Sequence, residues 1–497
     1  MSYVTISKIN ETFLYVDASP SIKAEIEDFF KFRPPNYQFS PKYKMKMWDG
    51  WIRLYSQHSQ TLHVGLSSYL TKFCKDSGYS LQLSGDVEYK DSGLISEKQV
   101  IDIINNDLQI PEKYERRDYQ INAIKHAINH NRAVLLSATG SGKSLMQYIL
   151  VRFYQAMLKD DKKLVIIVPT TSLVHQMIKD FGEYSSEDDG WNVEDHVHGV
   201  MAGVDKETDK QIIVTTWQSA IKMPKTFFKT VGFINVDECH LAEANSIKKI
   251  AEACVKCKYR FGTTGTLKDS KAHVLTIEGL LGPAYSVATT VELMDRNILS
   301  AMKINCIHLQ YSDAEKKALA RKDYKTEMDW IESNEKRCRF LAEMGDYFAK
   351  NTLFLFSHRS HGKSLYNELK KSKCPDMVYY VDGTVSAETR EHIRAACEDE
   401  SKIVYVVASY QTFSTGISIN NLHNIVFMSS TKAPIRILQS IGRGLRKHKS
   451  KSVCNVYDIA DDLRHKSWTN YSIRHAKERE LIFIREGFNY SRKKIQL

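Results

Sequence analysis

One segment of the chain combines glycines, a lysine and hydroxyl groups at a spacing suited to holding phosphates. It reads Ser137-Ala138-Thr139-Gly140-Ser141-Gly142-Lys143-Ser144. Glycines let backbone N–H groups approach phosphate oxygens, Lys143 would reach the β- and γ-phosphates, and the Ser144 hydroxyl would bind Mg²⁺. Ser137 stands where this pattern usually begins with glycine. Because an apolar run precedes the segment and a helical pattern follows, we favour a phosphate-binding loop over a plain Gly/Ser turn.

Two adjacent carboxylates, Asp237 and Glu238, follow the apolar run 233–236. Phosphoryl transfer to water needs such a pair: Asp237 would hold the metal's coordination shell, and Glu238 would orient and deprotonate the attacking water. An acidic pair at a strand end is usually solvated loop charge. Its place after a phosphate-binding loop favours the catalytic interpretation.

Two arginines near the other end of the chain, Arg443 and Arg446, are three residues apart and follow Gln439. We expect them to share one helix face, from which they could clamp the charge that develops on the γ-phosphate. The alternative is a basic helix facing nucleic acid, which the neighbouring cations would support: Lys447, His448, Lys449 and Lys451. We favour arginine fingers, with the basic run as surface or backbone contact.

The elements that must position these residues alternate short β-rich runs with amphipathic segments of ten or more residues, which is typical of parallel sheets covered by helices. We expect two tandem α/β domains. The predicted strands are 133–137, 164–169, 211–215, 233–236 and 259–263, then 352–356, 378–381, 403–408, 424–428 and 452–458. The polar segment 86–97 is expected to be a loop, and the charged segment 461–497 to be helical.

Residues 1–110 are expected to form a small accessory domain with a dense basic and aromatic stretch at 29–55. In this stretch cations interleave with rings: Lys42, Lys44, Lys46 and Arg53 with Tyr43, Trp48, Trp51 and Tyr55. The rings could stack on bases, or they could form the core of the small domain itself. We favour the second interpretation for the rings and expect the cations to contact DNA phosphates.

Composition fits a soluble globular protein of about three domains: 497 residues, 42% hydrophobic and 26% charged. The net charge of +11 and the pI near 8.9 favour polyanionic partners but decide nothing alone. No apolar run is long enough to span a bilayer, and the N-terminus lacks a secretory pattern. Nine cysteines suit a reducing compartment, and the close pair Cys254 and Cys257 is expected to be buried thiols instead of a zinc site.

The three chemical segments, in this order, resemble motifs I, II and VI of superfamily 2 helicases of the DExH type. Further segments between about residues 112 and 460 resemble the rest of the set. They are Arg117-Asp118-Tyr119-Gln120, where the Gln reads adenine, Val168-Pro169-Thr170-Thr171-Ser172-Leu173, Thr215-Thr216-Trp217-Gln218-Ser219, Phe354-Leu355-Phe356-Ser357-His358 and Ser414-Thr415-Gly416-Ile417-Ser418. Thr264-Gly265-Thr266 fills the place of motif III but departs from the commoner Ser-Ala-Thr.

This resemblance implies a fold of two tandem RecA-like parallel-sheet domains, 111–300 and 301–460, behind the small N-terminal α/β accessory domain and before a helical extension, 461–497. It implies ATP and Mg²⁺ as cofactors and an ATP site between the two RecA-like domains. The catalytic residues implied are Lys143, Asp237, Glu238, Gln439, Arg443 and Arg446. Nucleotide contacts would come from Arg117, Gln120, Thr139, Gly140, Ser141, Gly142, Lys143, Ser144 and Gly416, with Ser144 and Asp237 as metal ligands. Nucleic-acid contacts would come from Pro169, Thr170, Thr171, Thr216 and Thr415, beside Lys42, Lys44, Lys46 and Arg53.

A closer resemblance, over nearly the whole chain, is to the recombination helicases of T-even bacteriophages. Segments 39–43, 48–54, 168–173, 237–242, 408–418 and 446–448 carry it. It implies an ATP-dependent DNA helicase that unwinds or branch-migrates forks and Holliday junctions and displaces RNA from R-loops in phage recombination, repair and replication, with 3′ to 5′ polarity. It also implies a monomer in the cytoplasm of the infected host, with recombination and single-strand-binding proteins as partners. The alternatives are an RNA helicase, a restriction-type DNA translocase subunit and a non-catalytic ATP-gated clamp.

Overall fold

The computed structural model describes residues 3–34, 37–84, 94–204, 206–241, 245–267, 270–416, 419–429 and 434–497. The chain divides into two compact units, one formed by 1–137 and 142–287 and the other by 138–141 and 288–497. Each unit contains one seven-stranded sheet. The predicted pair of RecA-like sheets behind a small N-terminal α/β domain is confirmed.

The large sheet of the first unit has the strand order β10-β11-β9-β12-β13-β8-β14, and its strands from β10 to β8 pair in parallel. Its strands are β8 (Arg132–Ser137), β9 (Lys163–Val168), β10 (Val197–Val200), β11 (Ile212–Thr216), β12 (Val231–Asp237), β13 (Tyr259–Thr264) and β14 (Ala284–Ala288). Five of these strands are buried almost throughout, as expected for a parallel sheet covered on both faces.

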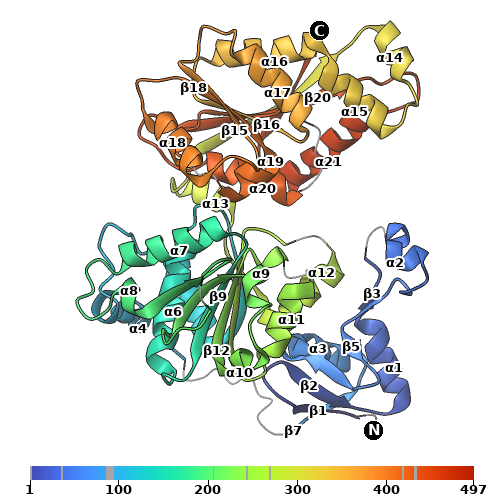
Figure 1. Ribbon diagram of the computed structural model, residues 1–497. Coiled ribbons are helices and arrows are strands. Elements are labelled where there is room, and N and C mark those ends of the chain that lie inside the picture. The colour runs from blue at the N-terminus through green and yellow to red at the C-terminus, as the bar shows by residue number, and fades with distance from the viewer. Residues whose placement is uncertain are drawn as a thin grey trace. The chain divides into compact units, whose positions relative to one another are not determined.

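Helices cover both faces of this sheet (Figure 1). One face carries α4 (Glu97–Asp102), α5 (Asp118–His130), α6 (Lys143–Met157), α7 (Thr171–Tyr184) and α8 (Val193–His196). The other face carries α9 (Trp217–Ala220), α10 (Lys225–Thr230), α11 (Asn245–Ala253) and α12 (Lys271–Leu281). Two apolar clusters, one on each face, form the core of the domain.

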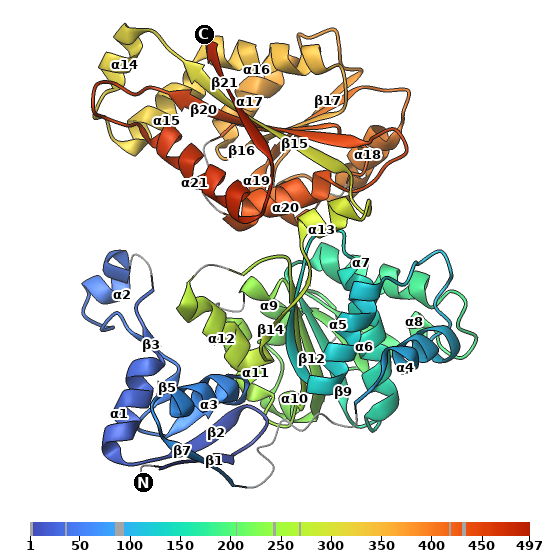
Figure 2. The ribbon, with the colours of Figure 1, turned by 180° about the vertical axis from the view of Figure 1, so that it is seen from behind.

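The N-terminal domain is a five-stranded sheet of order β5-β6-β2-β1-β7. Its elements are β1 (Tyr3–Lys8), β2 (Phe13–Asp17), α1 (Pro20–Phe29), β5 (Tyr55–Ser56), β6 (Thr61–His63), α3 (Ser67–Asp76) and β7 (Ser80–Ser84). Between α1 and β5 an arm projects from this domain in both ribbon views (Figures 1 and 2). The arm consists of β3 (Lys31–Phe32), the 3₁₀ turn Tyr37–Phe39, α2 (Pro41–Lys44) and β4 (Ile52–Arg53), which pairs with β3.

The N-terminal domain packs on the first RecA-like domain through apolar and polar side chains, and Leu275 of α12 joins its apolar core. The hydroxyl of Tyr69 donates to Glu278 Oε2 at 2.6 Å, and His63 Nε2 lies 3.0 Å from Glu252 Oε1. The buried guanidinium of Arg260 donates to Thr12 Oγ1 at 2.7 Å. These polar contacts and the shared apolar core join the accessory domain to the first RecA-like domain in one compact unit.

The sheet of the second unit has the order β17-β18-β16-β19-β20-β15-β21 and is parallel throughout. Its strands are β15 (Ala301–Gln310), β16 (Thr352–Phe356), β17 (Met377–Val381), β18 (Val404–Ser409), β19 (Asn424–Phe427), β20 (Val453–Asp462) and β21 (Tyr490–Gln496). Its helices are α13 (Thr290–Asp295), α14 (Asp313–Leu319), α15 (Tyr324–Ser333), α16 (Glu335–Phe348), α17 (Arg359–Leu369), α18 (Ala387–Glu398), α19 (Tyr410–Gly416), α20 (Pro434–Gly444) and α21 (Tyr471–Arg485). Figures 1 and 2 draw α16 and α17 on one face of this sheet and α19, α20 and α21 on the other.

The segment 461–497, expected as a helical extension, belongs to the second domain. It contributes α21 and the edge strand β21, which pairs with β15 in parallel register. The edge strand β21 carries exposed Arg492, Lys493 and Lys494. Charged side chains on an edge strand hinder its pairing with other chains. Most of the predicted loop 86–97 lies outside the described residues. Among those described, no helix is long and apolar enough to cross a membrane.

Candidate nucleotide site and nucleic-acid pocket

The predicted phosphate-binding loop joins the end of β8 to the start of α6. Gly140 and Gly142 both have left-handed backbones, with φ of +86° and +87°, which explains glycine at each position. At Gly142 a Cβ atom would come within 2.2 Å of Gln120 Nε2. Lys143 begins α6, and its Nζ donates to the Ser137 carbonyl at 3.2 Å. The loop therefore places a lysine at the N-terminus of a long helix, where an anion is favoured.

Gln120, predicted to read adenine, lies against this loop. It is on the first turn of α5 and is 3% exposed. Its Oε1 accepts a hydrogen bond from the backbone N–H of Arg117 at 3.1 Å. The fold thus brings the Gln120 segment and the phosphate-binding loop together, as the helicase resemblance implies.

The carboxylate of Asp237 is positioned by two neutral donors at the carboxyl end of β12. Its Oδ1 accepts from Gln147 Nε2 at 3.1 Å and from Thr263 Oγ1 at 2.9 Å. Burial raises the pKa of Asp237, and the neighbouring Glu238 raises it further, while Lys143 and the two donors act in the opposite direction. Asp237 and Glu238 offer carboxylate oxygens, and Ser144 offers a hydroxyl from the first turn of α6; these are oxygen donors of the kind that Mg²⁺ prefers.

Sequence reasoning missed Gln147, although its spacing holds a signal. Gln147 lies four residues after Lys143, which is one helical turn along the same face of α6. It also missed Tyr184 on α7, whose hydroxyl lies 2.8 Å from Ser144 Oγ. No local spacing indicates Tyr184, because it lies 40 residues away in the chain.

Glu238 and the motif III segment are in direct contact. Thr264 Oγ1 donates to Glu238 Oε2 at 3.4 Å, and His240 Nδ1 lies 3.3 Å from the same oxygen and 3.0 Å from Thr264 Oγ1. Glu238 has a φ of +48°, a backbone conformation that non-glycine residues rarely adopt and that is common at active sites. The departure from Ser-Ala-Thr therefore leaves a polar link between the two motifs.

Arg443 and Arg446 do not share a helix face, contrary to the expectation from their spacing. Arg443 lies in the last turn of α20, whereas Arg446 lies two residues beyond its end. The helix stops at Gly444, whose carbonyl accepts from Lys451 Nζ at 2.8 Å. Lys451 is itself buried and also donates to the Asn420 carbonyl, so it does not belong to a solvated basic surface.

Three further predicted site residues, Gln439, Thr415 and Gly416, lie in the second unit. Gln439 lies within α20, half-buried. Thr415 and Gly416 lie at the end of α19, and the two residues that follow them in the motif V segment fall outside the described residues.

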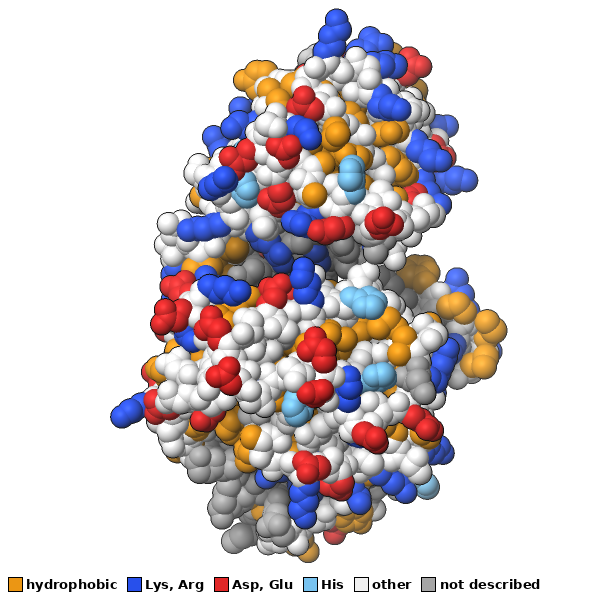
Figure 3. Space-filling view, turned by 60° about the vertical axis from the view of Figure 1, so that its left-hand side comes forward, with side chains coloured by type: hydrophobic (Ala, Val, Ile, Leu, Met, Phe, Trp, Pro, Cys, Tyr) orange, Lys and Arg blue, Asp and Glu red, His pale blue; other side chains and the backbone are white. Residues whose placement is uncertain are grey.

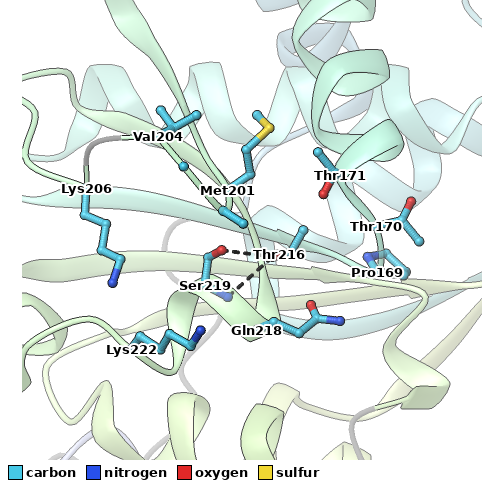
Figure 4. Close-up of a pocket in the computed structure, with 12 residues that line it drawn as sticks. Pro169, Thr170, Thr171, Met201, Val204, Lys206, Thr216, Gln218, Ser219 and Lys222 are labelled. Carbon is cyan, nitrogen blue, oxygen red and sulfur yellow. Dashed lines mark hydrogen bonds between the residues drawn. The ribbon is translucent and has the colours of Figure 1, made fainter. Parts of the chain in front are cut away.

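Four predicted nucleic-acid contacts, Pro169, Thr170, Thr171 and Thr216, line one cavity of about 550 Å³ (Figure 4). The other lining residues are Met201, Ala202, Gly203, Val204, Lys206, Gln218, Ser219 and Lys222. Figure 4 shows Lys206 and Lys222 on the side of the cavity opposite Thr170 and Thr171. Hydroxyls, helix N-termini and two cations around one hollow suit a phosphate backbone. Sequence reasoning did not single out either lysine.

In the arm of the N-terminal domain, the aromatic rings pack within the domain, whereas most of the cations lie at its surface. Tyr37 and Tyr43 pack edge to face at 4.9 Å, and Arg33 lies over the Trp51 ring at 4.5 Å, so these rings support the arm itself. Tyr55 is fully buried in the domain core. Arg53 pairs with Glu27 at 3.0 Å and with Asp49 at 2.6 Å. Lys42, Lys44 and Lys46 are exposed.

Cys254 and Cys257 are both buried, and burial raises the pKa of Cys257 to about 11. Cys257 Sγ contacts the Tyr259 carbonyl at 3.2 Å. In the part of the chain that the structure describes, no group of three or more His, Cys, Asp or Glu residues is arranged to hold a metal ion.

Three family models match successive parts of the chain. The N-terminal domain of the DNA helicase UvsW matches residues 7–84, the res subunit of type III restriction enzymes matches 113–269, and the helicase conserved C-terminal domain matches 337–448. Together they match the accessory domain, the first RecA-like domain and the second RecA-like domain in this order.

Comparison with individual proteins gives the same family over the full length. The chain is 34% identical over 502 aligned positions to the ATP-dependent DNA helicase UvsW of Enterobacteria phage T4, covering 97% of each chain. The crystal structure of T4 UvsW matches with a TM-score of 0.52 at 32% identity and 99% coverage of both chains. The DNA-bound helicase MrfA matches with a TM-score of 0.57 at 16% identity, over 78% of this chain and 54% of that one, and shows the fold alone. The chain belongs to the UvsW family of ATP-dependent DNA helicases.

Proposed function

We propose that this protein hydrolyses ATP to unwind forks, branch-migrate Holliday junctions and displace RNA from R-loops. One observation carries the proposal. In a chain that aligns over 97% of its length with an ATP-dependent DNA helicase, Lys143, Asp237 and Glu238 lie at one edge of one sheet. Thr264 of motif III donates to Glu238 there.

The side chains have distinct roles in the proposed hydrolysis. Lys143 binds the β- and γ-phosphates, and Gln120 hydrogen-bonds the adenine. Mg²⁺ held by Ser144 and Asp237 would supply charge stabilisation to the phosphates. Glu238 accepts the proton of the attacking water. Its contacts with Thr264 and His240 hold the Glu238 carboxylate in place. Arg443 and Arg446 neutralise the charge that develops on the γ-phosphate.

The proposed path of the DNA strand follows the cavity at Thr170, Thr171 and Thr216. Thr170 and Thr216 cap α7 and α9, so backbone N–H groups of two helix N-termini lie beside the cavity. Lys206 and Lys222 add charge. Such contacts hold phosphates without reading bases, as a motor that moves along any sequence requires. Thr415 is proposed to contact the same strand from the second unit.

We place this activity in the recombination, repair and replication of a phage genome, in the cytoplasm of the infected host. The enzyme is proposed to act as a monomer, with recombination and single-strand-binding proteins as partners.

The test is to measure ATPase and strand separation side by side on forked DNA, four-way junctions, R-loops and duplex RNA. We expect forks and four-way junctions to stimulate both, and RNA to be released from R-loops. Preference for duplex RNA would make the protein an RNA helicase. ATP-driven translocation without strand separation would favour a restriction-type motor. Nucleotide binding without phosphate release would indicate an ATP-gated clamp.

A further inference from the structure

The tip of the N-terminal arm exposes three large apolar side chains on one short stretch. Phe39, Met45 and Met47 are 65%, 65% and 74% exposed. Single exposed apolar side chains are common on soluble proteins, but a group of three on one projection marks a binding surface. In Figure 3 the arm is the faded projection at the right-hand edge, where hydrophobic side chains lie at its surface.

Side-chain packing within the arm holds its tip in place, so these apolar side chains stay exposed. The Tyr37 ring packs edge to face on Tyr43 and against Gly50, where a Cβ atom would come within 2.6 Å of it. Gly50 has a φ of +85°, which other residues rarely adopt. Trp48 Nε1 donates to the Trp51 carbonyl at 2.8 Å and closes the turn. These contacts use aromatic rings inside the arm, and the apolar side chains of the tip stay at its surface.

The charge of the tip selects an anionic partner. Lys42, Lys44 and Lys46 alternate with the apolar residues, and no acidic residue occurs between positions 29 and 48. Lys44 Nζ lies 5.9 Å from the centre of the Phe39 ring, so cation and apolar surface are adjacent. A partner that offers both phosphates and flat apolar faces fits this arrangement, and unpaired bases at a DNA branch point offer both.

We infer that the arm tip seats at the branch point of the DNA, where Phe39, Met45 and Met47 cover the faces of the terminal bases. Lys42, Lys44 and Lys46 then contact the flanking phosphates. Phe and Met side chains serve as wedges between base steps in other DNA-binding proteins, where they unstack the bases. The inference rests on the proposed function, because it assigns to the arm the separation of strands that the ATP-driven motor delivers.

The first experiment replaces the apolar tip in the full-length protein: Phe39→Ser, Met45→Ser and Met47→Ser together. Fork unwinding is expected to fall about tenfold, which is within the range for losing base stacking at one or two positions. ATPase stimulated by single-stranded DNA is expected to stay within about twofold, since the tip does not contact the nucleotide. A 2-aminopurine base at the fork junction should lose its fluorescence change on binding of the variant.

Two controls separate the proposed role of the apolar tip at the branch point from other roles of the arm. Phe39→Trp with Met45→Leu and Met47→Leu keeps an apolar tip and should retain unwinding. Tyr347→Ser removes an 87% exposed ring from α16 in the second unit and should change nothing. Wild-type unwinding and junction fluorescence in the serine variant would overturn the inference and leave the tip to a protein partner. Failure of the wild-type protein to unwind any branched substrate would instead overturn the proposed function.

Discussion

The side-chain amide of Gln147 lies 3.1 Å from the carboxylate oxygen Oδ1 of Asp237. Because Lys143 and Gln147 are one turn apart on α6, the same helix presents the lysine proposed to bind phosphate and orients the carboxylate proposed to bind Mg²⁺. Thr263 donates to the same oxygen from β13. Movement of α6 relative to the sheet would therefore change phosphate binding and carboxylate orientation together.

Replacing Gln147 by Leu should shift the acid limb of the ATPase pH profile to higher pH. Asp237 must be ionised to bind a cation, and burial already raises its pKa. The Gln147 amide stabilises the ionised form, so its loss raises this pKa further, and activity is lost sooner as the pH falls. We expect kcat at neutral pH to drop by about tenfold to a hundredfold, the scale of a lost hydrogen bond to a charged group.

The matched control for this variant is Gln176→Leu, which removes an exposed amide that donates to Asp180 on α7. Its pH profile should be that of the wild type. An unshifted acid limb in Gln147→Leu would show that the ionisation of Asp237 does not limit turnover.

Tyr184→Phe should lower the Mg²⁺ concentration needed for half-maximal ATPase. The Tyr184 hydroxyl lies 2.8 Å from Ser144 Oγ, and when it donates to that oxygen it occupies a lone pair that a cation would otherwise use. A neutral hydrogen bond contributes about 0.5–1.5 kcal/mol, which corresponds to a shift of roughly twofold to tenfold. Burial raises the pKa of Tyr184, so the effect should not vary with pH between 6 and 9, roughly the range below a tyrosine's ordinary pKa.

Tyr114→Phe is the control for Tyr184, because its ring packs on Tyr184 at 4.8 Å while its hydroxyl bonds Glu183. It should leave the Mg²⁺ titration unchanged. An equal shift in both variants would assign the effect to ring packing instead of to the Ser144 bond.

Much of the fold is predictable from the chain because its central strands are buried on both faces. Each predicted strand coincides with an observed one, since runs such as those of β9 and β16 are almost wholly apolar. The strand β15 escaped prediction because polar Lys303, Asn305 and His308 interrupt its apolar pattern. The strand β21 escaped it because charged side chains occupy an edge position.

The candidate site is predictable only where one local segment supplies the chemistry. Lys143, Asp237 and Glu238 follow from such segments. Gln147 and Tyr184 act through contacts made by the tertiary fold, and these are absent from any single motif. The end of α20 shows the same limit: a three-residue spacing cannot indicate that the helix stops between Arg443 and Arg446.

Lys206→Ala and Lys222→Ala should weaken DNA binding uniformly across sequences. Both side chains line the cavity that contains Thr170 and Thr216, and a lysine that contacts a phosphate releases a bound counterion. We expect each variant to reduce the slope of log affinity against log salt concentration by about one. Lys98→Ala on α4, an exposed lysine outside the cavity, should leave the slope unchanged. Equal slopes in all three variants would remove this cavity from the DNA path.

Arg479→Met should destabilise the second unit by about 3–5 kcal/mol, because it leaves a buried carboxylate without its partner. Arg479 Nε donates to both oxygens of Asp458, at 2.8 and 3.0 Å, and both side chains are 1% exposed. The pair joins α21 to β20 and holds the C-terminal segment in the core. Thermal unfolding measures the loss.

Pairing Arg479→Met with Asp458→Leu should recover most of that stability, since no buried charge remains. The exposed pair of Arg394 and Glu391 serves as comparison, and Arg394→Ala should cost less than about 1 kcal/mol. A small loss in Arg479→Met would mean that water reaches Asp458 and that α21 is not held by this pair.

Lys143→Ala and Glu238→Gln should abolish ATP turnover by different routes while leaving DNA binding. Loss of Lys143 removes the cation from the phosphate site, so nucleotide affinity should fall together with kcat. Glu238→Gln keeps the shape and the contact with Thr264 but cannot accept the proton of water, so ATP should bind and remain unhydrolysed. Phosphate release, nucleotide binding and fork binding measured on both variants separate these effects. Hydrolysis by Glu238→Gln within about tenfold of the wild-type rate would remove Glu238 from the role of general base.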